Sequence, residues 1–68
     1  MTDEQAIQAF NDGVAVIHNS HEGSMMYERI SALITRHDPK TGQDVLTVEL
    51  YKTHEICIAN PARVFRID

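Results

Sequence analysis

Hydrophobic and polar residues alternate along the chain between Met25 and Tyr51, with one turn sequence between the two alternating runs. The first run has one face made up of Met26, Glu28, Ile30, Ala32 and Ile34, and another made up of Tyr27, Arg29, Ser31, Leu33 and Thr35. In the second run, Leu46, Val48 and Leu50 alternate with Val45, Thr47, Glu49 and Tyr51. Alternation with a period of two is typical of β-strands, so this stretch predicts a long β-hairpin.

The turn between the two runs has a sequence that suits a hairpin. Pro39 is favoured at the second position of a type I turn, and Gly42 is suited to a left-handed backbone conformation. A type I turn that ends in a left-handed glycine is a common hairpin connection, with a bulge at the glycine.

The N-terminal residues predict a short helix over about residues 3–11. Thr2 followed by Gln5 fits a capping box, and Gly13 is well placed to end the helix. An isolated helix of this length is marginal in water, so we expect it to pack against the rest of the chain.

The remaining segments predict further short strands. Residues 14–17 form a β-branched run that predicts the first strand, and residues 18–24 are polar and predict a loop. Residues 56–58 predict the fourth strand, residues 60–63 a single helical turn, and residues 64–67 the last strand.

Five short strands with tight connections predict a small antiparallel barrel. The helical turn at residues 60–63, before the last strand, and the polar loop at residues 18–24 resemble the corresponding features of SH3-like barrels. The resemblance covers about residues 14–67. It implies a mainly β fold, a five-stranded antiparallel SH3-like barrel preceded by a short N-terminal α-helix, in one domain over residues 1–68. The aromatic and acidic residues with which true SH3 domains bind peptides are missing.

Composition narrows the class of protein. The net charge of −4 argues against a general affinity for nucleic acid or anionic membranes. Cys57 is the one cysteine, which excludes an intrachain disulfide and indicates a reducing compartment. No apolar run approaches the roughly 18 residues that span a bilayer. We therefore expect a cytoplasmic protein without a membrane segment.

The chemistry-bearing residues do not form a recognisable catalytic or metal motif. His18, His21 and Glu22 fall in the predicted loop, where nothing fixes their spacing, and the second half of a zinc site is missing. Cys57 with His54 is a weak candidate for a nucleophile, because a free cysteine more often behaves as a small hydrophobe. We expect no enzyme activity, no cofactor and no metal site.

The outer face of the hairpin is the most suggestive surface. The predicted partner-binding residues on this face are Tyr27, Arg29, Leu33, Val45 and Tyr51. Two explanations stay open. The N-terminal helix covers this face with Ile7 and Phe10, or another protein does.

The main functional hypothesis is a non-enzymatic interaction module that binds another protein, or itself, through a sheet face or an open strand edge. The alternative is a small nucleic-acid-binding barrel in which the basic residues gather on one side and tyrosines stack on bases. Those basic residues are Arg29, Arg36, Lys40, Lys52, Arg63 and Arg66.

Overall fold

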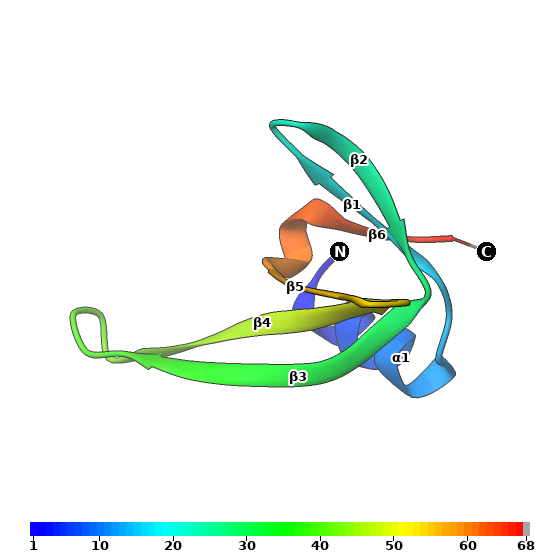
Figure 1. Cartoon of the computed structure of the whole chain (residues 1–68). Helices are drawn as coiled ribbons and strands as arrows, with labels where there is room; N and C mark the ends of the chain where they lie inside the picture. Colours follow the sequence, from blue (N-terminus) through cyan, green and yellow to red (C-terminus); the bar gives the residue numbers. More distant parts are fainter. Residues whose placement is uncertain (68) are drawn as a thin grey trace.

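The computed structural model describes residues 1–67 and is mainly β, with one helix, as the sequence predicts (Figure 1). The elements in chain order are α1 (Asp3–Asp12), β1 (Val16–Ser20), β2 (Gly23–Tyr27), β3 (Arg29–Asp38), β4 (Gln43–Lys52), β5 (Glu55–Ala59), the 3₁₀ turn η1 (Pro61–Arg63) and β6 (Val64–Arg66).

The predicted five-stranded SH3-like barrel is wrong. The described residues form six strands in two three-stranded antiparallel sheets, and neither sheet closes into a barrel. The first sheet has the order β2-β1-β6 and the second has the order β3-β4-β5. Figure 1 shows the β1–β2 and β3–β4 hairpins diverging from the point where β2 runs into β3.

The break at Glu28 is one reason for the sixth strand. The sequence alternates through this position, so one continuous strand was the expectation. Instead the chain bends at Glu28, which leaves the first sheet behind and starts the second. The Glu28 amide donates a hydrogen bond of 2.8 Å to the Tyr51 carbonyl, which fixes the bend against the end of β4.

The two sheets do not join into a barrel at β5 and β6. η1 separates these two strands. Within residues 1–67, β5 pairs with β4 and β6 pairs with β1. β5 and β6 are therefore edge strands of separate sheets.

A single core joins the two sheets and the helix. Its largest fully buried side chains are Ile30, Leu50, Val16, Val48 and Val64, each at most 1% exposed. They come from β1, β3, β4 and β6, so both sheets turn their inner faces to one cluster. α1 adds its two buried alanines, Ala6 and Ala9, to the same cluster.

The predicted helix and its capping are confirmed. The Thr2 hydroxyl accepts a hydrogen bond from the Gln5 amide, and the Gln5 side chain accepts one from the Thr2 amide. Gly13 ends the helix in a left-handed conformation with φ 66°. The capping box satisfies two of the N–H groups that a helix N-terminus leaves unpaired.

The left-handed glycine of the hairpin turn and the single helical turn are also as predicted, but the predicted bulge at Gly42 is not seen in the register of β3 and β4. Gly42 has a φ of 71°, and its amide donates to the Asp38 carbonyl over 2.8 Å. Asn60 caps η1 by accepting a hydrogen bond from the Ala62 amide. The predicted loop at residues 18–24 is different, because β1 continues through Ser20 and a tight turn leads directly into β2 at Gly23.

Replacing a core leucine tests the shared core. We expect Leu50→Ala to lower the free energy of unfolding by about 2–5 kcal/mol, because Leu50 is fully buried among side chains of both sheets and leaves a cavity. Chemical denaturation measures the change. The matched control is Ile56→Ala on the edge strand, which is 63% exposed and should change the stability by no more than about 0.5 kcal/mol. Similar losses in both variants would contradict a core centred on Leu50.

Candidate interaction surface

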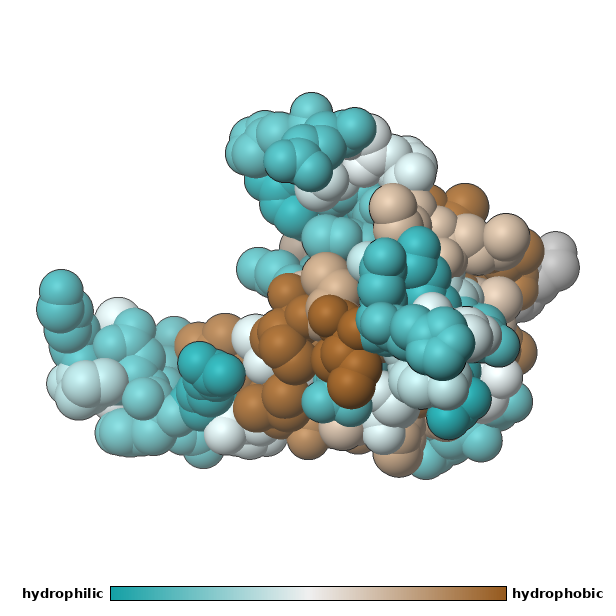
Figure 2. Space-filling model, in the orientation of Figure 1, coloured by the Kyte–Doolittle hydropathy of each residue, from teal (hydrophilic) through white to brown (hydrophobic). Residues whose placement is uncertain are grey.

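β5 is the strand whose surroundings most favour recognition. It pairs with β4 along one side, from Lys52↔Glu55 to Val48↔Ala59. Side chains alternate along it, so that Ala59 is buried, Cys57 is half-buried, and Ile56 and Ile58 point outward. Ile56 is 63% exposed and Ile58 47%. Figure 2 shows hydrophobic surface over the part of the molecule where β5 and the adjoining stretch of β4 lie.

Polar and aromatic residues on the same outer face flank the two isoleucines. Ile56 lies opposite Tyr51, and Ile58 lies opposite Glu49. Tyr51 in turn lies opposite Arg29, whose guanidinium carbon sits 4.3 Å from the centre of the tyrosine ring. This contact is a cation–π interaction. The outer face of the second sheet therefore has an apolar edge beside an ordered Arg29–Tyr51 pair.

The predicted partner-binding residues fall on two different sides of the sheet. Arg29, Tyr51 and Val45 lie on the outer face, and Val45 is 46% exposed. Tyr27 is only 6% exposed and belongs to the core, and Leu33 packs against the core. The structure thus brings Arg29 and Tyr51 together and removes Tyr27 and Leu33 from the outer face.

Two irregularities along β2 and β3 explain why Tyr27 and Leu33 face the core rather than the outer face. Tyr27, Ile30 and Leu33 face inward at a spacing of three, whereas a regular strand has a spacing of two. The bend at Glu28 adds one residue to the alternation, and a bulge at Ser31 adds another, where the register with β4 shifts between Ile30 and Ala32. The Ser31 hydroxyl donates to the Glu49 carboxylate over 2.8 Å and stabilises the bulge.

α1 does not cover the exposed edge. Its buried residues Ala6 and Ala9 face the core shared by the two sheets, and Phe10 packs against the same core. Ile7, which the covering hypothesis required, is 42% exposed. The exposure of Ile56 and Ile58 shows that the outer side of β5 lies open to solvent.

The basic residues predicted for nucleic-acid binding are distributed over several elements. They are Arg29 and Arg36 on β3, Lys40 in the hairpin turn, Lys52 at the end of β4, Arg63 in η1 and Arg66 on β6. Lys52 Nζ lies 3.3 Å from a Glu55 carboxylate oxygen, and Arg66 lies 2.8 Å from Asp12. Arg29 stacks on Tyr51. Local partners thus engage these three cations.

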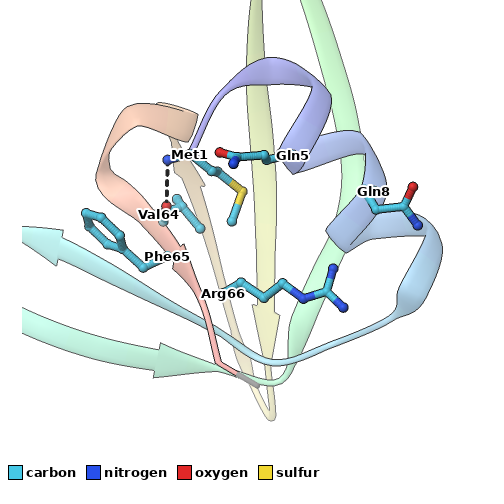
Figure 3. A pocket seen from close by; sticks show the side chains of 6 residues that line it. All are labelled: Met1, Gln5, Gln8, Val64, Phe65 and Arg66. Atoms are coloured by element: carbon cyan, nitrogen blue, oxygen red, sulfur yellow. Dashed lines mark hydrogen bonds between the residues drawn. The ribbon is translucent and has the colours of Figure 1, made fainter.

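A hollow of about 590 Å³ separates α1 from β6 (Figure 3). Gln5 and Gln8 line it from the helix, and Val64, Phe65 and Arg66 line it from β6. At one end the N-terminal ammonium of Met1 donates to the Val64 carbonyl over 3.0 Å.

At the other end of α1, Arg66 offsets an unfavourable charge. Asp12 lies in the last turn of the helix, where a carboxylate opposes the helix dipole, and that turn has no basic residue. The hydrogen bond from Arg66 lowers the pKa of the Asp12 carboxyl below its usual value, with a further contribution from Gln8.

One histidine and the cysteine lie close together, which the sequence did not reveal. His18 Nδ1 lies 4.0 Å from Cys57 Sγ, although 39 residues separate them in the chain. The predicted partner of Cys57, His54, sits in the exposed turn before β5, and His21 is exposed in the β1–β2 turn. Burial raises the pKa of the Tyr27 phenol, and a hydrogen bond with Cys57 adds to the shift. Within residues 1–67, no three His, Cys, Asp or Glu side chains converge as a metal site.

The chain matches no protein-family model, no curated protein and no solved structure. The helix in residues 1–67 is also too short and too polar to cross a membrane.

The pairing of Asp12 with Arg66 predicts a pH dependence of stability. A carboxyl whose pKa is lowered on folding stabilises the native state above its ordinary pKa of 3.8, and this contribution is lost as the pH falls through the lowered value. We expect Asp12→Asn to be less stable than the parent at pH 7, and the difference to shrink at low pH. Urea denaturation at a series of pH values measures both. A difference that stays constant down to pH 2 would contradict the pairing.

Proposed function

We propose that this protein is a non-enzymatic interaction module that binds another protein, or a second copy of itself, by adding a strand of the partner alongside β5. The observation that carries the proposal is the exposed pair Ile56 and Ile58 on an edge strand, 63% and 47% exposed. The lone cysteine supports a reducing, cytoplasmic setting for this binding.

The backbone of an edge strand offers part of the binding energy. On the side away from β4, the amides and carbonyls of β5 are available to a partner strand, as in other cases of β-strand addition. Natural edge strands are usually protected by lysine, proline or bulges. β5 has the sequence Glu-Ile-Cys-Ile-Ala, in which Glu55 is the one charged residue. Its edge is thus poorly protected against pairing.

The isoleucine side chains supply the apolar contribution. Complete burial of an isoleucine gives about 1.5–3 kcal/mol, and both residues retain roughly half of their surface for such a gain. The Arg29–Tyr51 pair lies beside them on the same face. Tyrosine and arginine are enriched where partners bind most strongly, so this pair adds specificity at the margin of the apolar contact.

The nucleic-acid alternative has weaker support. Arg29, Lys52 and Arg66 are engaged by Tyr51, Glu55 and Asp12. The net charge of −4 also disfavours binding to phosphates, whose attraction to a protein depends on clustered cations.

A double substitution tests the edge directly. We expect Ile56→Lys/Ile58→Lys to abolish association, because two charges on the apolar edge repel a second strand. Light scattering over a range of protein concentrations measures self-association. Affinity capture from lysate of the source organism, with and without nuclease, measures binding to other proteins. The parent protein should form a stoichiometric complex, with itself or with a captured protein, that nuclease does not remove.

The control is Val45→Lys, which introduces the same charge on the same outer face at a site that is 46% exposed but lies on the hairpin rather than on β5. It should leave association intact. Equal loss in both variants would indicate a general effect of charge on the sheet face. A complex that survives the double substitution would overturn the proposal, and recovery of nucleic acid that moderate salt removes would favour the alternative.

A further inference from the structure

A second hollow, of about 310 Å³, lies between the first sheet and β5. Three side chains in its lining carry soft donor atoms, namely His18 from β1, Met25 from β2 and Cys57 from β5. His18 and Met25 lie on one hairpin, and Cys57 is 39 residues from His18. Only the fold brings an imidazole, a thioether and a thiol to the wall of one cavity.

The strand pairing fixes two of the three donors relative to each other. His18 and Met25 are direct partners in the β1–β2 ladder, so their side chains leave the sheet on the same face. Cys57 reaches the hollow from the other sheet, because it is on the inward side of β5, between the outward-facing Ile56 and Ile58. The Cys57 sulfur then lies 4.0 Å from His18 Nδ1.

We propose that this hollow binds a soft monovalent metal ion, Cu(I), through Cys57 Sγ, His18 Nδ1 and Met25 Sδ. Binding displaces the thiol proton to solvent and forms metal–sulfur and metal–nitrogen bonds. No electron is transferred, because the ion is already in its reduced state. The site is independent of the outer surface of β5 and does not rest on the proposed function.

The spacing of the two nearest donors suits a metal ion between them. With a metal–sulfur bond of about 2.3 Å and a metal–nitrogen bond of about 2.0 Å, atoms 4.0 Å apart correspond to an angle at the metal of roughly 137°. This angle is wider than tetrahedral and fits an ion with few ligands. Met25 lies in the lining of the same hollow, and its unbranched side chain can turn from Lys52 toward the other two donors.

The chemistry of the donors selects the ion. Thiolate and thioether ligands favour Cu(I), whereas structural zinc sites need four ligands from Cys, His, Asp or Glu. Such a set is missing from residues 1–67, so methionine sulfur is the available third donor. Zinc therefore lacks the ligands that it needs here, and a soft ion with lower coordination does not.

Two neighbouring residues influence the site. The buried Tyr27 side chain lines the same hollow as Cys57, and its hydroxyl is a donor for the thiolate once the metal has replaced the proton. Lys52 Nζ lies 2.7 Å from Met25 Sδ and must release the thioether when the ion binds. Lys52 keeps an anionic partner in Glu55, whose carboxylate is 3.3 Å away.

The experiment is a titration of the full chain with Cu(I) under anaerobic conditions, in competition with a chromophoric Cu(I) chelator. The expected result is one ion per chain. We expect Cys57→Ser to weaken binding at least about 100-fold, and His18→Gln and Met25→Leu to weaken it about 10-fold each. Circular dichroism confirms that each variant is folded.

Two controls separate the site from ordinary thiol reactivity. His21→Gln removes an exposed histidine of the β1–β2 turn and should leave the affinity unchanged. Cys57→Ser/Ala62→Cys moves the thiol to an exposed position in η1 and should not restore binding. Equal affinity in the parent, His18→Gln and Met25→Leu, or full restoration by the moved thiol, would overturn the proposal. So would a stoichiometry other than one.

Discussion

The rest of the structure depends on which residues of β2 and β3 face the core. Tyr27, Ile30 and Leu33 all face the core, at intervals of three residues, because the chain bends at Glu28 and bulges at Ser31. Each irregularity adds one residue to an alternation of two. Without the bend Tyr27 would lie on the same side as Arg29, and without the bulge Leu33 would face solvent and Ala32 the core.

The same constraint creates both candidate sites. By turning the chain from one sheet into the other, the bend brings the inward side of β5 opposite β1 and β2, where Cys57 meets His18. It leaves the outward side of β5 facing solvent with two isoleucines. One short strand thus presents a thiol to the hollow beside the first sheet and two isoleucines to solvent.

Local features of the fold were predictable from sequence, and long-range ones were not. The capping box at Thr2 and Gln5, the left-handed glycines at 13 and 42, and the capped turn at Asn60 depend on residues within a few positions of each other. The bend at Glu28 is fixed by a hydrogen bond to Tyr51, 23 positions away, and it changes the number of strands and the side that Tyr27 faces. Arg29 and Tyr51 kept their predicted face because the bend and β4 place them opposite each other. The pairing of His18 with Cys57 had no local signal at all.

The free edge of β5 is the edge that we propose binds a partner strand. Amide hydrogen exchange, compared between dilute protein and the complex that forms with itself or with a captured partner, tests it most directly. The structure predicts slower exchange on complex formation at β5 amides that point away from β4, with the amides of the β3–β4 turn unchanged. Unchanged exchange throughout β5, with new protection confined to another element, would contradict it.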